Sequence, residues 1–570
     1  MMKRGFFILT LLITNKLFCQ NPLFIPPVLS GTEFDLQVQN GTVEFFPGVT
    51  TPTYGINGNI LAPTLIMNKW DWVTLNVTNN LTGSGNSTTM HWHGFHLPAM
   101  ADGGPHQIIE QGTTWSPSFQ VLNNASTYWY HPHGDGKTDL QVARGLAGII
   151  IVRDSMEAEL NLPRTYGTDD FPIIIQTKAF DILYQIAIAT EEDTFVCVNA
   201  TPKAFLEAPA QVIRYRILNG SSMRVFNLGF TDDKTFFLIG TDGGLLNAPV
   251  ALSRLLLAPG ERAEILVDMQ GLESETVYLK SFNSELLNGF YGAATVTGMM
   301  GGEIAGYELN PLNGYDFDIL QLNIVEQTTD AVLDIPSTLI ENYPFTEYDA
   351  FREFILQPDD MMDADAHVMG PFNINGDKFS MDVINETVYI NTKEKWRVSN
   401  NTGIAHPFHI HDVQFTIDNI NGDVAPLHLQ GNKDVVLIPP MEYAEVIMEF
   451  KDFADHEIPY MYHCHMLHHE DDGMMGSFTV IDTSLNIDDE NINPFNVYPN
   501  PVLNTCTIQI PDEIHVYGMV LLNTLGEKIE NLSDKGDNSY TIKMNHLDSG
   551  PYVLQILTEE KMLSKVIMKL

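Results

Sequence analysis

The sequence predicts an all-β protein built from several β-sandwich domains. Strand-like runs rich in Val, Ile, Phe and Thr dominate its 570 residues, and Gly, Asn, Asp and Pro separate them. No long stretch shows the periodicity of an amphipathic helix. Short strands between frequent turn signals are typical of β-sandwiches. At roughly 150 residues per domain, the length allows three or four domains.

The N-terminal segment, residues 1–19, has the pattern of a signal peptide. Lys3 and Arg4 form a basic start, and a mostly apolar core follows from Gly5 to Phe18. This core is too short to span a membrane, and no later segment approaches the roughly 20 apolar residues that a spanning helix needs. The sequence therefore predicts an exported chain with no membrane span.

Composition shifts divide the rest of the chain into four units. They predict domains over residues 20–162, 163–312 and 313–485, an acidic linker over 486–493 and a small β-rich module over 494–570. FPIIIQTKAF, at residue 171, and DFDILQLNIV, at residue 316, look alike. We interpret them as the openings of two repeated domains of similar size.

The charge of the chain excludes some partners. It has 72 acidic and 30 basic residues, a formal net charge of -42. Nucleic acid and anionic membranes both require basic patches, so neither is expected as a partner. Cationic substrates such as metal ions are compatible with the charge, although the simplest interpretation is a soluble exported protein adapted to salt. The four cysteines do not form the pattern of a disulfide framework.

Four histidine clusters indicate metal sites. In a strand, residues i and i+2 share a face, so each His-x-His step can direct two imidazoles at one point. One such step alone is more often a polar surface pair, but four are not. In HCHMLHHEDDGMM, Cys464 faces away from both neighbouring histidines, so one strand can serve two metal sites. A thiolate, imidazoles and a weak thioether form a blue-copper ligand set. The candidate ligands are His91, His93, His131, His133, His406, His409, His411, His463, Cys464, His465, His469 and Met474.

These segments resemble the copper-ligand motifs of multicopper oxidases, the family of laccases, bilirubin oxidases and bacterial cuprous oxidases. The resemblance covers residues 24 to 482 and implies three cupredoxin-like β-sandwich domains, with copper in the first and third. It implies four copper ions. The type 1 ion would be held by His406, Cys464, His469 and an axial Met474, and the type 2 ion by His91 and His409. The type 3 pair would be held by His93, His131, His133, His411, His463 and His465.

The resemblance also implies an activity. One-electron oxidation of a donor at the type 1 copper would be coupled to four-electron reduction of dioxygen to water at the trinuclear cluster. Glu470 resembles a proton-relay carboxylate on the type 3 side, and Asp102 an acidic group near the type 2 copper. Alternatively, both carboxylates only hold ligand imidazoles. Asp434 resembles an acidic residue near the type 1 site, where it would orient His406 or contact a cationic substrate.

The sequence leaves the electron donor open. Either a phenolic or bilirubin-like compound or a metal ion such as Cu(I) is compatible with the resemblance. Thioethers suit Cu(I), and methionines occur beside acidic residues, but such methionines also serve as packing residues. They are Met299, Met300, Met361, Met362 and Met369. The alternative function is a non-catalytic copper-binding or scaffold protein of the cupredoxin superfamily.

The C-terminal module has its own resemblance. It begins PFNVYPNPVLN and ends SKVIMKL, and it resembles the sorting domain of the bacterial type IX secretion system. This implies the type IX machinery as a partner, transit through the periplasm, and release or display at the cell surface. The alternative is an accessory β-sandwich that binds a surface glycan.

Overall fold

The computed structural model consists of two compact units, Met1–Asp482 and Thr483–Leu570. It describes residues 20–83, 86–298, 302, 307, 310–359, 367–482, 495–511, 516–523, 528–532, 539–558 and 562–570. The predicted signal peptide (1–19), the linker (486–493) and Met299, Met300, Met361 and Met362 lie outside these residues. No helix within the described ranges is both long and apolar enough to cross a membrane.

The first sandwich has two sheets. One has the order β2 (Val28–Ser30), β5 (Thr64–Asn68), β11 (Gly148–Arg153), β10 (Ser126–His131) and β7 (His91–His93). The other has β4 (Val49–Ile56), β3 (Glu33–Phe46), β6 (Trp72–Asn79) and β8 (Thr114–Trp115), with β9 (Ser118–Gln120) also on β6. Along β6, Val73, Leu75 and Val77 are fully buried and alternate with partly exposed polar residues. This two-residue period directs one face of the strand into the core.

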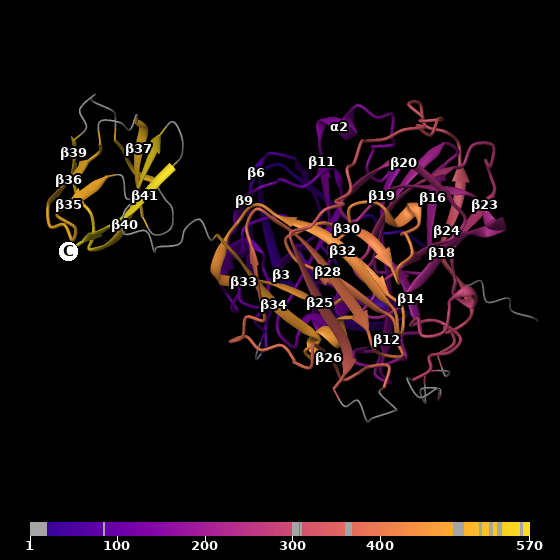
Figure 1. Cartoon of the computed structure of the whole chain (residues 1–570). Helices are drawn as coiled ribbons and strands as arrows, with labels where there is room; N and C mark the ends of the chain where they lie inside the picture. The colour runs from indigo at the N-terminus through magenta and orange to yellow at the C-terminus, as the bar shows by residue number, and fades with distance from the viewer. Residues whose placement is uncertain are drawn as a thin grey trace, which may run out of the picture. The chain divides into compact units, whose positions relative to one another are not determined.

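The second sandwich also has two sheets (Figure 1). The larger has β15 (Thr201–Pro202), β14 (Phe195–Val198), β12 (Asp170–Phe180), β17 (Val212–Asn219), β22 (Arg262–Asp268), β19 (Phe236–Thr241) and β20 (Gly244–Leu252), with β13 (Ile186–Ala187) on β12. The other has β1 (Asn21–Pro22), β16 (Ala204–Pro209), β24 (Asp316–Val325), β23 (Thr276–Phe282), β18 (Phe226–Phe230) and β21 (Leu255–Leu257).

The position of β24 differs from the sequence-based interpretation. DFDILQLNIV forms β24, which pairs with β16 and β23 instead of opening the third sandwich. The similar FPIIIQTKAF is β12 of the same sandwich. The two segments are alike because each has one face in the same core: Ile173 and Ile175 of β12 pack in one cluster with Leu320 and Leu322 of β24. A strand pattern reports burial, but it does not report which sheet buries the strand.

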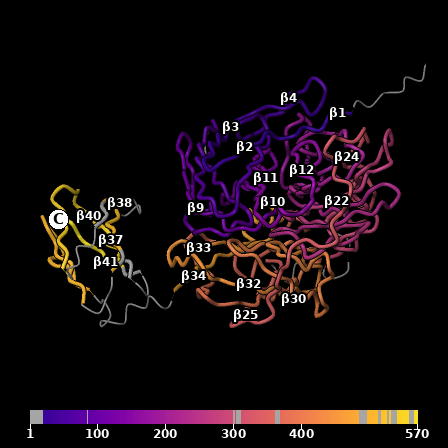
Figure 2. The backbone as a smooth tube through the Cα atoms, turned by 90° about the horizontal axis from the view of Figure 1, so that it is seen from above, coloured from indigo at the N-terminus to yellow at the C-terminus, as the bar shows by residue number. Residues whose placement is uncertain are grey.

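The third sandwich carries most of the candidate ligands. One sheet has β26 (Phe372–Ile374), β25 (Ala350–Pro358), β28 (Thr392–Asn400), β32 (Tyr443–Phe450) and β30 (Phe415–Ile420). The other has β27 (Glu386–Tyr389), β34 (Met475–Ile481), β33 (Asp455–Cys464), β29 (His406–Ile410) and β31 (Val435–Ile438). Figure 2 shows β33 beside the indigo and purple strands of the first sandwich, although some 330 residues separate them in the chain.

Helices are short and lie between strands. The α-helices are α1 (Thr138–Ala143), α2 (Ser155–Ala158) and α3 (Leu467–Asp471). The 3₁₀ turns are η1 (Ala99–Ala101), η2 (Thr231–Asp233), η3 (Asn283–Glu285) and η5 (Leu427–Leu429). Of these, α3 matters most for the site, because it directly follows the Cys464 strand and carries His469 and Glu470.

The C-terminal unit is a separate small β structure. One sheet has β35 (Asn496–Tyr498), β36 (Thr505–Gln509) and β39 (Ser539–Lys543). The other has β38 (Lys528–Leu532), β37 (Val516–Leu522), β40 (Gly550–Thr558) and β41 (Met562–Lys569). Its own apolar core includes Ile508, Leu521, Leu554 and Ile567, all fully buried. The unit therefore has a core independent of the three larger sandwiches.

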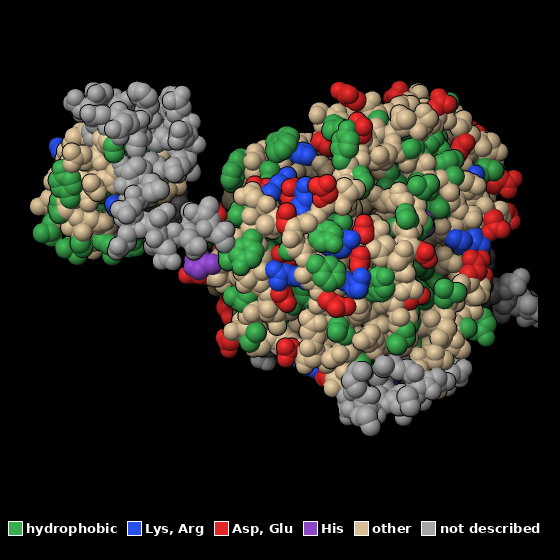
Figure 3. All heavy atoms as spheres, viewed as in Figure 1, with side chains coloured by type: hydrophobic (Ala, Val, Ile, Leu, Met, Phe, Trp, Pro, Cys, Tyr) green, Lys and Arg blue, Asp and Glu red, His purple; other side chains and the backbone are tan. Residues whose placement is uncertain are grey.

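Acidic side chains are scattered over the visible surface of the larger unit, whereas basic ones gather in a few places (Figure 3). On the outer face of the third sandwich, Arg397 of β28 lies over the ring of Tyr443 of β32, at 4.6 Å. The neighbouring Lys395 pairs with Asp418 at 3.0 Å. The few cations of this face are thus paired with carboxylates and aromatic rings.

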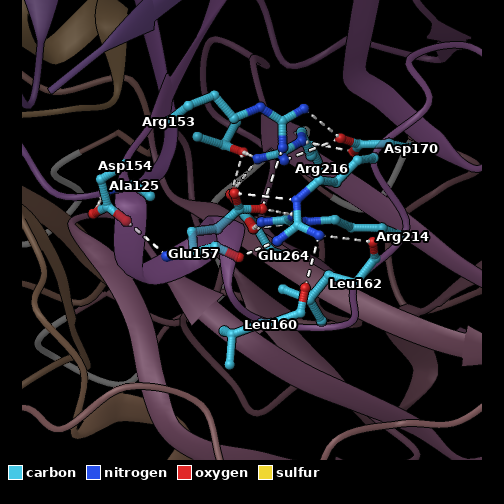
Figure 4. A network of polar contacts seen from close by, with 12 residues as sticks. Ala125, Arg153, Asp154, Glu157, Leu160, Leu162, Asp170, Arg214, Arg216 and Glu264 are labelled. Atoms are coloured by element: carbon cyan, nitrogen blue, oxygen red, sulfur yellow. Dashed lines mark hydrogen bonds and ion pairs between the residues drawn. The ribbon is translucent and has the colours of Figure 1, made fainter.

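A buried network of charges joins the first and second sandwiches (Figure 4). Three guanidinium groups meet three carboxylates there: Arg153, Arg214, Arg216, Glu157, Asp170 and Glu264. Arg216 binds Asp170 at 2.7 Å and Glu264 at 2.6 Å. A fourth guanidinium, that of the partly exposed Arg164, lies 3.4 Å from Glu157 at the edge of the network. Because every buried charge has an oppositely charged, hydrogen-bonded partner, the cost of removing these groups from water is offset.

This network gives the protein a pH-dependent stability. Burial by itself would raise the pKa of Glu157, but Arg214 and Arg153 outweigh burial and lower that pKa to about 2. The ionised carboxylate therefore contributes full stability above pH 4.5, and the contribution is lost as the pH falls from 4.5 toward about 2. We expect Glu157→Gln to lower the unfolding midpoint at neutral pH. Between pH 4.5 and about 2, the midpoint of this variant should fall less than that of the unsubstituted protein.

Thermal unfolding followed across pH 2 to 7 measures the effect. Glu159→Gln is the matched control, because Glu159 is exposed at the end of the same helix. Identical pH slopes for Glu157→Gln and the unsubstituted protein would contradict the expected result.

Candidate functional site

The four histidine clusters come together where the first and third sandwiches meet. In the first sandwich, β7 pairs with β10 so that His91 lies opposite His131. In the third, β29 pairs with β33 so that His409 lies opposite His463 and Phe408 opposite Cys464. The His-x-His spacing places alternate imidazoles on one face of each strand. The ten histidines and the cysteine predicted as ligands are all buried.

One group consists of His406, Cys464 and His469. The Cys464 Sγ lies 3.4 Å from Nδ1 of His406 and 3.6 Å from Nδ1 of His469. The opposite nitrogens are occupied, since Nε2 of His406 contacts the Thr402 hydroxyl at 2.9 Å and Nε2 of His469 donates to the Val368 carbonyl at 3.0 Å. Both rings therefore present an Nδ1 lone pair to the thiol.

Met474 lies in the same buried core as Cys464. Its carbonyl accepts a hydrogen bond from the Cys464 amide at 3.1 Å, and its side chain is fully buried. The Phe372 ring packs against both imidazoles, with centroids 4.9 Å from His406 and 4.8 Å from His469. The sulfur and imidazole donors are thus enclosed by apolar and aromatic groups.

The other eight histidines form three groups, two of which share His411, and within each group the possible ligand atoms lie within 4.8 Å of one another. The groups are His91, His409 and His411; His93, His131 and His465; and His133, His411 and His463. Nε2 of His133 lies 3.0 Å from Nε2 of His463 and 3.2 Å from Nε2 of His411. Neutral imidazole nitrogens this close together need a bound cation between them or a shared proton.

Several of these nitrogens have no hydrogen-bond partner, although they are buried. His91 and His409 donate through Nδ1 to the backbone carbonyls of Asp102, at 2.9 Å, and Asp434, at 2.7 Å. Their Nε2 atoms, and both ring nitrogens of His465, have none. A buried unpaired nitrogen is costly. This arrangement of free lone pairs is what a metal-binding site requires, so the donor set fits copper.

Burial also sets the protonation of the rings. It lowers the pKa of His463 and His469 to about 3, and the pKa values of His93, His131 and His133 fall well below 6.5 because burial and neighbouring imidazoles act together. These imidazoles are neutral at physiological pH, which is the form that binds metal. Burial raises the pKa of the Cys464 thiol, so ionisation of this thiol depends on a positive charge at the site.

Asp102 connects two of the histidine groups. Its Oδ2 accepts a hydrogen bond from Nδ1 of His411 at 2.8 Å, and its Oδ1 lies 3.4 Å from Nδ1 of His91. It follows η1, and its side chain is buried. The predicted carboxylate is therefore in contact with candidate ligands from both the first and the third sandwich.

Glu470 lies on α3, one residue after His469. Its two carboxylate oxygens each lie 3.3 Å from an Nδ1 atom, one of His133 and one of His463. Burial and the neighbouring Asp471 raise the pKa of Glu470, and burial raises the pKa of Asp471 to about 7. Asp471 in turn accepts two backbone N–H bonds, each 2.9 Å, from the start of α1. A chain of acidic groups thus leads from the histidines toward α1.

The structure places Asp434 beside His93 and His409 and not beside His406. Asp434 is fully buried, its Oδ1 lies 3.1 Å from Nε2 of His93, and its carbonyl binds His409. Asp434 therefore lies beside the group of eight histidines, not beside the Cys464 group. The next residue, Val435 of β31, pairs with His409 of the antiparallel strand β29. This pairing, which the sequence does not reveal, fixes the direction of the Asp434 side chain.

Arg262 is a site residue that sequence reasoning missed. It donates to both oxygens of Asp434 at 2.6 Å, and it also binds the carbonyls of Thr127, Gly260 and Asp242. Asp434 is 172 residues away in the chain, so no local motif marks the pair. Through Arg262, the second sandwich, which supplies none of the predicted ligands, supports the carboxylate that contacts His93.

Of the methionines proposed to contact Cu(I), Met369 is described. It is 9% exposed and packs in the core of the third sandwich. Its position favours a packing role, while the residue before it supplies the carbonyl that binds His469.

Comparisons with known proteins identify the family. Models of the multicopper oxidase family match residues 37–157 and 353–484, and a model of the secretion system C-terminal sorting domain matches residues 496–569. A Staphylococcus epidermidis multicopper oxidase, mco, is 33% identical over 78% of this chain and 88% of that protein. The cell division protein FtsP of Photorhabdus laumondii is 31% identical over 81% of this chain and 93% of that protein.

The fold is shared with solved structures. A laccase-like multicopper oxidase, CueO, from the lignin-degrading bacterium Ochrobactrum matches with a TM-score of 0.70 and 30% identity, covering 81% of this chain and all of the other. The all-β, cupredoxin-like fold predicted from the sequence is thereby confirmed. The sorting domain marks the chain for export by type IX secretion. The chain belongs to the multicopper oxidase family and carries a secretion system C-terminal sorting domain.

Proposed function

We propose that the chain is a copper-dependent oxidase with four copper ions: one type 1, one type 2 and two type 3. His406, Cys464, His469 and Met474 hold the type 1 ion, and the eight other histidines hold the trinuclear cluster. When bound, these ions supply one-electron acceptance from a donor and four-electron reduction of dioxygen to water. The observation that carries the proposal is the tripeptide His463–Cys464–His465, whose three side chains belong to three different ligand groups.

The polypeptide positions the ligand side chains and keeps water away from them. Through its two peptide bonds, the tripeptide connects the Cys464 group to the histidine group that contains His463 and to the one that contains His465. The proposed type 1 site and the trinuclear cluster are therefore covalently connected. The rings are held by backbone carbonyls, the Thr402 hydroxyl and carboxylates, which fix the nitrogen that faces the ion. Burial keeps the imidazoles neutral and excludes competing water.

Glu470 is the proposed proton donor to the trinuclear side, with Asp102 serving the type 2 side. We expect Glu470→Gln to lower oxygen uptake by about 10²-fold or more, because the amide keeps the shape but cannot release a proton. Copper content and blue colour should be unchanged, which separates proton delivery from ligand orientation.

Asp472→Asn is the matched control, since Asp472 ends the same helix but forms an exposed ion pair with Lys378. Normal turnover of Glu470→Gln with full copper would refute the relay. Loss of copper together with activity would assign Glu470 to holding His133 and His463 instead.

The donor is proposed to be a phenolic or bilirubin-like compound, with a metal ion such as Cu(I) as the alternative. Oxidase activity towards lignin model compounds and lignosulfonate is stated for the Ochrobactrum relative, and the interior packing of Met369 gives Cu(I) no support. Relative turnover of Cu(I), Fe(II), a phenol and bilirubin by the copper-loaded protein distinguishes the donors. Faster turnover of Cu(I) than of the organic donors would reverse the assignment.

A non-catalytic role is the second candidate, because FtsP proteins are also similar to this chain. Every ligand position implied by the family resemblance carries a His, Cys or Met, which favours the oxidase. Copper loading discriminates the two: a thiolate–Cu(II) site gives a blue protein that consumes oxygen with a donor, whereas a scaffold stays colourless or inactive.

For localisation, we propose transit through the periplasm followed by release or display at the cell surface. Mass spectrometry of the exported protein tests this, because the sorting module beyond residue 490 is expected to be removed.

A further inference from the structure

A cleft away from the Cys464 group has the side chains of a carbohydrate-binding site. It has a volume of about 710 Å³, within the usual range for ligand sites. Trp70 and Trp72 line it and are 62% and 65% exposed. Of the six tryptophans of the chain, Trp92, Trp129 and Trp396 are buried and Trp115 is half-buried, whereas these two are exposed. Their flat faces are suited to stacking against a ring.

Trp70 is held in an uncommon conformation. Its φ is +77°, in the left-handed region, which is strained for a bulky residue. Its amide donates to the Val121 carbonyl at 2.7 Å, and its carbonyl accepts from the Gln120 side chain at 3.0 Å. Such strain is retained where the surroundings enforce it, often at a binding site. The indole is therefore presented to solvent by a rigid support.

An ammonium group is positioned over this indole. Lys69 Nζ lies 5.0 Å from the Trp70 ring centroid and donates to Asn124 Oδ1 at 2.8 Å. An ammonium has three donors, so one hydrogen bond leaves capacity for a ligand. Lys451 also lines the cleft. Burial is the main cause that lowers the pKa of Lys69; Asp154 opposes it, and the charge of Lys451 adds to it. Among the described residues, no carboxylate lies within ion-pair distance of either lysine.

The lining of the cleft contains both ion-paired and unpaired charges. Asp452 is paired with His96 at 3.2 Å. Although burial opposes it, Asp412 and Asp452 raise the pKa of His96 to about 9, so this ring is cationic at neutral pH. Its charge is balanced by Asp452 and by the buried Asp412, which lies 2.8 Å from its Nδ1. Among the described lining residues, the charges that belong to no ion pair are Lys69 and Lys451 against Glu449. Two unpaired ammonium groups against one carboxylate, on a chain of net charge -42, are complementary to an anionic ligand.

Amide side chains complete the lining, namely Gln120, Asn123, Asn124, Gln414 and Asn432. An amide offers both a donor and an acceptor, which matches the paired hydroxyls of a sugar ring. An aromatic acid would use the indoles and the ammonium groups but not the amides. We propose that this cleft binds an acidic polysaccharide, with a pyranose ring on Trp70 and Trp72 and its carboxylate at Lys69 and Lys451. An exported protein would meet such a polymer outside the cell.

The test uses the full-length protein and oligogalacturonate as the probe. Isothermal titration is expected to show saturable binding, and the probe should protect tryptophan fluorescence from acrylamide quenching. Trp70→Ala and Trp72→Ala should each weaken binding about five- to tenfold, because each removes a stacking face. Lys69→Ala and Lys451→Ala should remove the preference for oligogalacturonate over a neutral xylo-oligosaccharide.

Tyr315→Ala and Lys280→Ala are the controls, since Tyr315 is exposed elsewhere and Lys280 forms an exposed pair with Asp318; neither should change binding. Retained oxidase activity and unfolding midpoint would show that the variants are folded. No saturable binding, or equal binding by the double tryptophan variant, overturns the site. Tighter binding of 2-naphthoate than of the sugar assigns the cleft to aromatic acids and overturns the carbohydrate proposal.

Discussion

Cys464→Ser is expected to abolish the blue colour and donor-dependent oxygen uptake while removing one copper ion per chain. A hydroxyl cannot replace the thiolate that gives a Cu(II) site its intense absorption and its link to the donor. Cys464 Sγ lies 3.4 Å from Nδ1 of His406 and 3.6 Å from Nδ1 of His469. The trinuclear ligands are untouched, so their copper should remain. Copper analysis, visible absorption and an oxygen electrode measure the three results.

Cys197→Ser is the matched control. Cys197 is also buried and free, but it lies on β14 of the second sandwich, far in sequence from every candidate ligand. This variant should keep its colour and activity. A Cys464→Ser protein that remained blue, or that still oxidised donors at the original rate, would contradict the proposed type 1 site.

Arg262→Gln is expected to destabilise the protein by about 3 to 5 kcal/mol, because it leaves the Asp434 carboxylate buried without its partner. Arg262 is fully buried, and each of its contacts to Asp434 is 2.6 Å long. Since Asp434 also contacts His93 and His409, copper should be lost from the trinuclear cluster before the blue site is affected. Denaturant unfolding measures the loss of stability. Copper analysis together with the blue absorption shows from which site copper is lost.

Arg254→Gln provides the comparison. Arg254 lies in the same sandwich but forms an exposed pair with Glu285 and Asp233, and its loss should cost at most about 1 kcal/mol. To cover a failure of Arg262→Gln to fold, Asp434→Asn serves as a second variant that keeps the side-chain shape. If both variants bound full copper with the stability of the unsubstituted protein, Arg262 would have no positioning role.

The local features of the chain were readable from the sequence. Runs rich in Val, Ile, Phe and Thr between turn residues predicted the sandwich strands, and the His-x-His steps predicted pairs of imidazoles on one face, because both patterns depend only on neighbouring residues. Cys464 between two histidines predicted side chains shared between two sites. The structure places these three side chains in three different ligand groups.

Features that depend on long-range pairing were not readable. The strand DFDILQLNIV was expected to open the third domain, but β24 lies in the second sandwich, because the same burial pattern fits either sheet. Asp434 was expected near His406, and instead it contacts His93. Arg262 had no recognisable signal at all, since its partner is 172 residues distant.

The sequence by itself determined the family, the all-β fold and the candidate ligands, because ligand type and strand periodicity are properties of a few neighbouring residues. Only the tertiary structure decided which carboxylate supports which imidazole, how the second sandwich contributes through Arg262, and that Trp70 and Lys69 share a cleft with Lys451. These relations join segments hundreds of residues apart, and they are fixed by packing and by the pairing of buried charges, which no local pattern records.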